Sequence, residues 1–312
     1  MRRTALVFVA ACSGPSGPYF ATTMFFDRQA AGAPVAADSR AIIAELDNVG
    51  GWGNGNRFAI DFSIDVLAAD ASTPRMAFTP TSDWSAPDCD SDAVPIPAGG
   101  DVEGETGYAC TMNGDCHLIV FDRDAGELFE MWRANITTTF TGGCLAVWRV
   151  KQSYGDALRG DQCTSADAAG LPIAPLLFTA DEVASGSIDH AIRFVLPNDR
   201  VRRGFVRPAT HATDTTGSST APYYGVHLRL RADYPIDSLP SPGAKVVARA
   251  LQEYGMIHAD GGEIALTAQS DRHTTAKWAG LLAATDLGAL QVDDFEVIDH
   301  GAAIALTYDC HR

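Results

Sequence analysis

The clearest hydrophobic pattern in the chain is a strict alternation over residues 58–66. Every second residue from Phe58 to Val66 is apolar, and Asp61, Ser63 and Asp65 stand between them. Side chains of a strand alternate between its two faces, so this period of two predicts a strand with one buried face. Shorter patterns separated by Asp, Gly and Pro clusters predict further strands at His117–Phe121, Glu127–Ala134, Cys144–Val150, His190–Leu196 and Tyr223–Asp233.

Few segments have the period of a helix. The strongest is Pro242–Tyr254, which Ser241 precedes as an N-cap. Further helices are predicted at Ser39–Leu46 and Ala276–Ala284. Many strands with two or three helices predict an all-β fold of the β-sandwich or jelly-roll type, decorated by those helices. We expect residues 33–312 to form a single β-rich domain, because no repeat or low-complexity linker interrupts them.

The N-terminus has the composition of an export signal. Residues 1–11 contain a basic pair and a short apolar run that ends in small residues before Cys12. The ending VAAC resembles a bacterial lipobox, in which the Cys is lipidated, and residues 12–32 are expected to serve as anchor and tether. An ordinary secretory signal that contains a Cys is the alternative. Either interpretation predicts an exported protein, and the first predicts an envelope lipoprotein that meets the membrane only through its lipid.

Six cysteines follow Cys12, and an even number in an exported chain predicts disulfide bonds. Six cysteines allow fifteen pairings. The short spacing favours Cys110–Cys116, and we expect Cys144–Cys163 and Cys89–Cys310 for the rest. No Cys-x-x-Cys pair and no matching His pair occurs, so neither a metal nor another cofactor is predicted. The six residues are Cys89, Cys110, Cys116, Cys144, Cys163 and Cys310.

Charge and composition exclude several classes of protein. Lys and Arg number 23 against 39 Asp and Glu, which gives a formal net charge of −16. Such a chain repels phosphate backbones, so a nucleic-acid partner is not expected. Hydrophobic residues make up 46% and charged residues 20% of the chain, which is typical of a globular protein and argues against a disordered one.

Against this acidic background, one predicted strand carries a row of basic side chains. Tyr223, His227, Arg229 and Arg231 share one face of that strand, whose opposite face is apolar. Arg binds carboxylates through two parallel hydrogen bonds, so the row predicts a groove for an anionic ligand such as a uronate-bearing polysaccharide. The alternative is a solvated sheet face whose Arg residues pair with nearby acids.

A second candidate site is rich in carboxylates. Glu103 lies in a Gly-rich loop, and Asp122 and Glu130 come from the two strands of a predicted hairpin. Glycoside hydrolysis needs two carboxyl groups, one protonated as the acid and the other ionised as base or nucleophile. His117 opens the hairpin, and Trp132 offers a flat apolar face on which a sugar ring can stack. An acidic hairpin exposed to water is the alternative.

Several stretches of the chain together resemble a group of exported bacterial proteins of about this length that is uncharacterised. The resemblance implies one exported domain and names no reaction. The stretches are VPIPAGGDVEG (94–104), GDCHLIVFDRDAGELFE (114–130), TSADAAGLPIAPLLFTADEVASGSIDHAIRF (164–194), RPATH (207–211), LRLRADYPIDSLP (228–240), ALQEYGMIHADGG (250–262) and DDFEVID (293–299). The polar residues that these stretches contain include Glu103, Asp115, His117, Asp122, Glu130, His190, His211, Arg229 and Arg231.

These observations favour an exported enzyme that degrades a polysaccharide, with a glycoside hydrolase as the leading hypothesis. A polysaccharide lyase is the second. In that reaction His190, His211 or Tyr223 takes the proton next to a uronate, and Arg229 and Arg231 neutralise its carboxylate. A glycan-binding envelope lipoprotein without turnover is the third.

Overall fold

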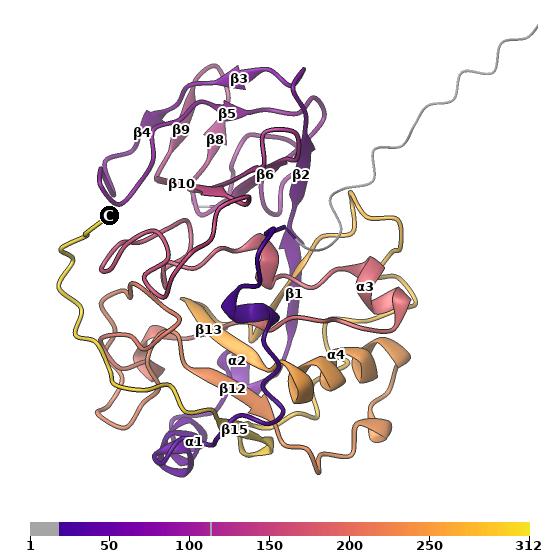
Figure 1. The fold of residues 1–312 in the computed structure, drawn as a ribbon. Helices are drawn as coiled ribbons and strands as arrows, with labels where there is room; N and C mark the ends of the chain where they lie inside the picture. The colour runs from indigo at the N-terminus through magenta and orange to yellow at the C-terminus, as the bar shows by residue number, and fades with distance from the viewer. Residues whose placement is uncertain (1–18, 113) are drawn as a thin grey trace, which may run out of the picture.

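Residues 19–112 and 114–312 are described by the computed structural model, in which strands in several sheets predominate over helices (Figure 1). The predicted predominance of strands is therefore confirmed. Cys12 and the predicted signal lie outside the described residues. No helix within the described ranges is long and apolar enough to cross a membrane. The helices are α1 (Ser39–Asn48), α2 (Gly53–Asn56), α3 (Ala180–Ser185) and α4 (Pro242–Glu253), and the 3₁₀ turns are η1 (Phe25–Asp27), η2 (Ala174–Leu176), η3 (Asn198–Arg200), η4 (Ile236–Ser238) and η5 (Val292–Asp294).

The larger sheet has six strands in the order β1-β14-β11-β13-β12-β15. It mixes directions: β1 runs parallel to β14 and β11 parallel to β13, whereas β12 is antiparallel to both of its neighbours. Helix α1 packs against β15 and α4 against β12. The strands are β1 (Ile60–Ile64), β11 (Ile192–Leu196), β12 (His227–Leu230), β13 (Met256–Gly261), β14 (Leu266–Gln269) and β15 (Phe295–Val297).

The second sheet has four strands in the order β10-β7-β6-β2, and two small sheets, β3-β5 and β4-β9-β8, lie beside it. Figure 1 shows this group in the upper part of the molecule and the six-stranded sheet in the lower part. The sandwich expected from the sequence is therefore not confirmed. The strands are β2 (Val66–Ala69), β3 (Arg75–Met76), β4 (Thr79–Pro80), β5 (Val94–Pro95), β6 (Leu118–Asp122), β7 (Glu127–Trp132), β8 (Asn135–Ile136), β9 (Phe140–Gly142) and β10 (Cys144–Arg149).

The predicted strand at residues 58–66 is divided between the two sheets. β1 ends at Ile64 after pairing with β14, and β2 begins at Val66 and pairs in parallel with β6. Asp65 stands between them and is buried, with 3% of its surface exposed. One extended segment therefore joins the sheets directly, without a loop.

Both faces of the four-stranded sheet are buried. Ile119, Leu128 and Trp148 point into the main core, which is shared with the six-stranded sheet. Their neighbours Leu118 and Phe129 point the other way, into a second apolar cluster. Burial on both faces explains why β6 reads as a continuous apolar run instead of an alternating one.

Two of the three predicted helices are confirmed. Helix α1 begins at Ser39, and α4 begins at Pro242 with the Ser241 hydroxyl accepting a hydrogen bond from the backbone N–H of Ala244. The helix predicted at Ala276–Ala284 is wrong. The amides of Ala276 and Trp278 donate to the carboxylates of Asp181 and Asp271, and Gly280 has a positive φ of 77°, which interrupts a helix. The segment is a series of turns.

Residues 19–32, which the sequence analysis assigns to the tether, are packed against the body. Phe20 and Met24 are buried in the main core. The guanidinium of Arg229 in β12 donates hydrogen bonds to the carbonyls of Ala31 and Ala33 at 2.9 and 3.1 Å. This segment is therefore fixed by apolar burial and by a cation that satisfies its backbone carbonyls.

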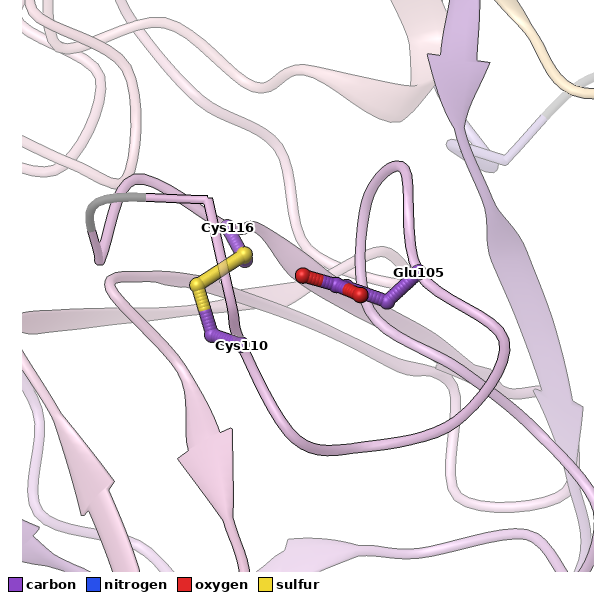
Figure 2. A group of neighbouring side chains, drawn as sticks. All are labelled: Glu105, Cys110 and Cys116. Carbon is purple, nitrogen blue, oxygen red and sulfur yellow. A yellow bond between two sulfur atoms is a disulfide. The ribbon is translucent and has the colours of Figure 1, made fainter.

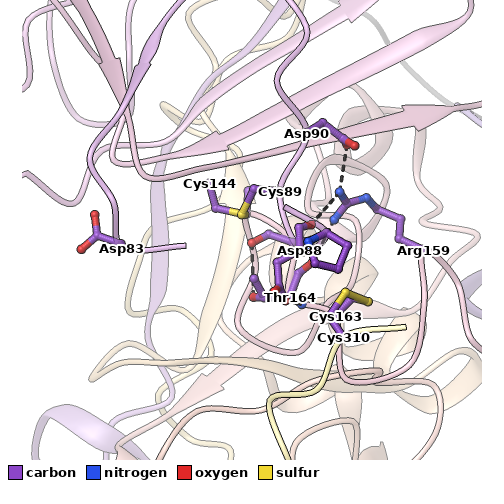
Figure 3. The surroundings of a disulfide bond; sticks show 12 residues. Asp83, Asp88, Cys89, Asp90, Cys144, Arg159, Cys163, Thr164 and Cys310 are labelled. Atoms are coloured by element: carbon purple, nitrogen blue, oxygen red, sulfur yellow. Dashed lines mark hydrogen bonds and ion pairs between the residues drawn. A yellow bond between two sulfur atoms is a disulfide. The ribbon is translucent and has the colours of Figure 1, made fainter. Parts of the chain in front are cut away.

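Three disulfide bonds are present among the described residues, and their existence is compatible with an exported protein. The predicted Cys110–Cys116 bond is confirmed. The other two predicted pairings are wrong, because Cys89 is bonded to Cys144 and Cys163 to Cys310 (Figure 3).

The tertiary structure accounts for the pairing of Cys89 with Cys144. Asp90, next to Cys89, makes two hydrogen bonds to the backbone of β10. Its amide donates to the carbonyl of Leu145, and its carboxylate accepts from the amide of Val147, each at 2.8 Å. These bonds bring Cys89 to the start of β10. Arg159 then ties Asp90 to the neighbouring segment, at 2.8 Å from both the Asp90 carboxylate and the Thr164 carbonyl (Figure 3).

Removing the disulfide bond that closes the longest loop of chain should destabilise the protein far more than removing the one that closes the shortest loop. Cys163–Cys310 spans 147 residues, whereas Cys110–Cys116 spans 6. Loop-closure entropy predicts that the C163S/C310S double variant loses about 3 kcal/mol more unfolding free energy than C110S/C116S. Denaturant unfolding of both variants measures this difference, and equal losses would contradict the prediction.

Candidate functional site

An open cleft of about 430 Å³ lies where the two larger sheets meet. Its polar wall brings together residues from β1, the loop before β6, β11 and the end of β13, four segments far apart in the sequence. The charged side chains that line it are Asp61, Glu103, Asp115, His117, Asp167, Arg193, Asp260 and Glu263.

Glu103 and His117 form a buried ion pair in this cleft. Glu103 Oε2 lies 2.6 Å from His117 Nδ1, and His117 Nε2 lies 3.1 Å from the carbonyl oxygen of Ala166. Both ring nitrogens therefore face acceptors, which a doubly protonated imidazole satisfies. The charge of Glu103 raises the pKa of His117 to about 9, against the effect of burial. His117 in turn holds the pKa of Glu103 below its usual value.

Asp61 lies beside this ion pair. The hydroxyl of Ser63 is 2.8 Å from Asp61 Oδ2 and 3.2 Å from Glu103 Oε1, so it bridges the two carboxyl groups. Burial and the nearby charge of Glu103 raise the pKa of Asp61. Two adjacent carboxyl groups thus have pKa values shifted in opposite directions, because His117 faces only one of them.

Arg193 occupies the floor of the cleft with all three guanidinium nitrogens engaged. Nε donates to Asp167 at 2.7 Å, Nη2 to Asp260 at 3.0 Å and Nη1 to the hydroxyl of Thr267 at 3.2 Å. Because the side chain of Arg193 is only 4% exposed, these pairs satisfy a charge that burial alone would make costly. The arginine therefore fixes β11 to its neighbours, and its charge is paired with two carboxylates.

Two tryptophans line the same cleft. Trp132, at the end of β7, donates from its indole Nε1 to Asp115 at 2.6 Å. Trp84 reaches the cleft from the loop that carries Cys89 and packs edge-on against His211, with ring centroids 5.2 Å apart. Each presents apolar ring surface beside the carboxyl groups. Trp132 therefore lines the same cleft as Glu103 and contacts Asp115 there.

Asp122 and Glu130, predicted as partners of Glu103, lie outside this cleft. Asp122 pairs with Arg75 at 2.8 Å at the far end of the β6–β7 hairpin. Glu130 is on the same face of β7 as Trp132 but lies deeper, fully buried in the main core, where it accepts hydrogen bonds from Trp148 Nε1 and from the amides of Ile173 and Ala174. Its burial raises its pKa to about 7.

The predicted bases lie at separate places. His190 pairs with Glu182 at 3.2 Å beside a different pocket, next to α3. His211 is fully buried behind Trp84, where Nδ1 donates to the carbonyl of Ala168, and burial lowers its pKa. Tyr223 packs its ring against the guanidinium of Arg202. None of these three side chains lines the cleft.

The basic row on β12 is distributed between internal contacts. His227 bonds to the carbonyl of Tyr254 at 2.7 Å, and burial lowers its pKa to about 4. Arg229 pairs with Glu296 at 2.6 Å as well as binding the segment before α1. Arg231 lies at a separate pocket near α1. The structure therefore pairs Arg229 with an acid, leaves Arg231 exposed, and places the row away from the cleft.

Sequence reasoning did not single out Asp61, Asp167, Arg193 or Asp260 as a group. Asp61 was visible only as a polar position of an alternating strand, which any exposed strand face shows. The other three lie within stretches that resemble the uncharacterised exported group, so reading every charged residue of those stretches would have found them. Their convergence depends on β11 and β13 being adjacent, which no local pattern reveals.

A second group of ligand-type side chains surrounds a disulfide. Glu105, Cys110 and Cys116 lie close together (Figure 2). The two sulfurs are bonded to each other, so neither is a thiolate that could bind a metal. Glu105 instead accepts hydrogen bonds from the amide and hydroxyl of Thr111. This group has a structural explanation.

Comparison with known proteins gives no assignment: the chain matches no protein-family model, no curated protein and no solved structure. The function therefore has to be argued from the cleft itself.

The pKa of His117 should depend on Glu103. We expect a value of about 9 in the folded protein, and in E103Q a value below about 6.5, because burial remains after the opposing charge is gone. NMR titration of the imidazole signals measures both. The matched control is E105Q in the same loop, which should leave His117 unchanged. A wild-type value near 6.5 would contradict the ion pair.

The raised pKa of His117 predicts how the free energy of unfolding depends on pH. The folded-state pKa of His117 lies above the unfolded value of about 6.5, so its contribution is fully present below that pH. It is lost as the pH rises through about 9.

Replacing Glu130 should affect folding and leave the cleft intact. In E130Q the amide group places a donor against the donors that Glu130 now accepts from, so we expect a loss of about 1–3 kcal/mol of unfolding free energy. Thermal and denaturant unfolding measure it. Unchanged stability would show that these hydrogen bonds contribute little.

Proposed function

We propose that this protein is an exported glycoside hydrolase in which Glu103 acts ionised and Asp61 acts protonated. The observation that carries the proposal is the Ser63 hydroxyl bridging two carboxyl groups whose pKa values are shifted apart, in a cleft lined by two tryptophans. Opposite shifts on neighbouring carboxyl groups are how glycosidases separate the acid from the nucleophile. Glu103 thus keeps the role expected from the sequence, and Asp61 takes that of its partner.

The spacing favours hydrolysis with retention of configuration. The bridged oxygens of Asp61 and Glu103 cannot be farther apart than the sum of their distances to the Ser63 hydroxyl, 2.8 and 3.2 Å. Inverting enzymes need about 6.5–9.5 Å to admit a water between the carboxyl groups, whereas retaining enzymes have about 5–5.5 Å.

The reaction then has two steps. Asp61 protonates the leaving oxygen while a Glu103 oxygen bonds to the anomeric carbon and the glycosidic bond breaks. Asp61, now ionised, takes a proton from water, whose oxygen displaces Glu103. The positive charge of His117 keeps Glu103 ionised before the attack.

The charge of the cleft favours a neutral glycan. Six acidic side chains line it against His117 and Arg193, and both cations are already paired with carboxylates. A uronate carboxylate would be repelled by this field and would find no free guanidinium. Trp84 and Trp132 instead offer the apolar ring surfaces that stack on neutral sugars.

The lyase alternative has less support in this geometry. A lyase needs a neutral base and a cation free to neutralise the uronate. In the cleft, both ring nitrogens of His117 face acceptors, and the charge of Arg193 is already paired with Asp167 and Asp260. The residues that the sequence predicted for this role do not line the cleft; they are His190, His211, Tyr223, Arg229 and Arg231. A glycan-binding protein without turnover would use the same tryptophans and is distinguished by assay.

Export and anchoring complete the proposal. The disulfides support an oxidising compartment. The apolar run before Cys12 supports lipidation of that residue, which would hold the cleft at the cell envelope.

The first test is turnover on a panel of neutral and uronate-containing polysaccharides. We expect new reducing ends from a neutral polymer, with the product retaining its anomeric configuration by NMR. E103Q and D61N should each lower turnover by about 10²–10⁴-fold. Activity should fall at acidic pH as Glu103 gains a proton and at alkaline pH as Asp61 loses one. E105Q and folded E130Q are controls that should keep activity.

Three outcomes would overturn the assignment. Full activity in both E103Q and D61N would remove these residues from the reaction. Ultraviolet absorbance from an unsaturated sugar would indicate a lyase. Saturable binding of a polysaccharide without any new reducing ends would indicate a glycan-binding protein.

A further inference from the structure

Asp65, Asp101 and His273 bring together three side-chain atoms that could each bind a cation. Asp65 comes from the junction of β1 and β2, Asp101 from the loop that carries Glu103, and His273 from the turn after β14. One oxygen of each carboxylate and one ring nitrogen all lie within 4.8 Å of one another. His273 Nε2 and Asp101 Oδ1 are 3.6 Å apart.

These three atoms are also buried without a hydrogen-bond partner. Asp65 Oδ1, Asp101 Oδ1 and His273 Nε2 make no hydrogen bond to another described residue, although His273 Nε2 is within ion-pair distance of Asp101 Oδ1, at 3.6 Å. The Asp65 side chain is only 2% exposed and that of Asp101 10%. Buried polar atoms are normally satisfied, and leaving one unpaired costs about 1–3 kcal/mol. Three such atoms within 4.8 Å of one another form a group that a single cation would satisfy.

The other oxygen of each carboxylate is already engaged. Arg272 Nη1 lies 2.7 Å from Asp101 Oδ2 and 3.3 Å from Asp65 Oδ2, and it also donates to the carbonyl of Glu105. Hydrogen bonds of this kind orient carboxylates that bind metal through their remaining oxygen. With Arg272 counted, the group keeps a net charge of −1 when His273 is neutral, which favours a cation.

We propose that Asp65, Asp101 and His273 bind one divalent transition-metal ion, with Zn²⁺ as the best fit. Two carboxylate oxygens and one imidazole nitrogen are ligands that Zn²⁺ accepts at about 2.0–2.2 Å, with water in the fourth position. Two atoms at that distance from one ion lie at most about 4.4 Å apart. The side chains therefore have to close by well under 1 Å, on the order of a side-chain adjustment.

The position of the ion would fix the spacing of the proposed catalytic pair. Asp65 belongs to the segment that carries Asp61, and Asp101 to the loop that carries Glu103. One backbone bond, from the Gly104 amide to the Ser63 carbonyl at 3.1 Å, already joins these segments. The Ser63 hydroxyl and Arg272 also link them, and a metal would add a direct link between their carboxylates. This consequence rests on the proposed function, whereas metal binding itself does not.

The test is metal content and binding, and it needs no substrate. The full chain, produced with its disulfides formed, is loaded with ZnCl₂, dialysed and measured by elemental analysis and calorimetry. We expect one Zn²⁺ per chain, a rise in the unfolding temperature on loading, and binding at least about tenfold weaker in H273A. His273 is partly exposed, so H273A should fold. D65N tests the buried ligand in the same way.

The matched control is H311A, which removes an imidazole that is 72% exposed and should leave Zn²⁺ binding unchanged. Less than stoichiometric Zn²⁺ in the wild type would overturn the site. So would equal affinity in the wild type and H273A, or Ca²⁺ binding that does not depend on His273. Hydrolysis without Zn²⁺ dependence would leave the metal site standing and overturn only its positioning role.

Discussion

Residues 60–69 form one extended segment that pairs first with β14 in the six-stranded sheet and then with β6 in the four-stranded sheet. A strand that continues from one sheet into another leaves no room for a flexible connection, so the two sheets meet at a fixed place. The cleft lies at this junction, and Asp61 and Ser63 come from the shared segment itself. Its location therefore follows from the path of a single strand.

The junction also concentrates charge in a buried place. Charges removed from water have to be paired, and each cation near the cleft is paired with a carboxylate: His117 with Glu103, Arg193 with Asp167 and Asp260. In a protein with a net charge of −16, acidic side chains outnumber basic ones, and these basic side chains make ion pairs inside the protein. Arg159 and Arg229 have the same role elsewhere, each holding a segment that has little regular structure.

Two disulfide bonds likewise hold segments that have little regular structure. Cys163–Cys310 holds the C-terminal segment, which makes few sheet contacts, and Cys89–Cys144 holds the long loop that delivers Trp84 to the cleft. Loops of this length lose much entropy when they are ordered. Covalent bonds and buried arginines compensate for regular structure that these segments lack.

The sequence by itself determined the strand-rich character of the chain, two of its helices and the local disulfide, because alternation, capping residues and short spacing act over a few neighbouring residues. It also pointed to Glu103, His117 and Trp132 as parts of one site. Only the tertiary structure decided that Asp61, and not Asp122 or Glu130, lies beside Glu103. The deep burial of Glu130 in the main core and the adjacency of β11 with β13 are set by long-range pairing and by burial on both sides of a sheet. A local sequence pattern does not contain information on long-range pairing. The ion-pair partner of each charged side chain is therefore known only from the assembled sheets.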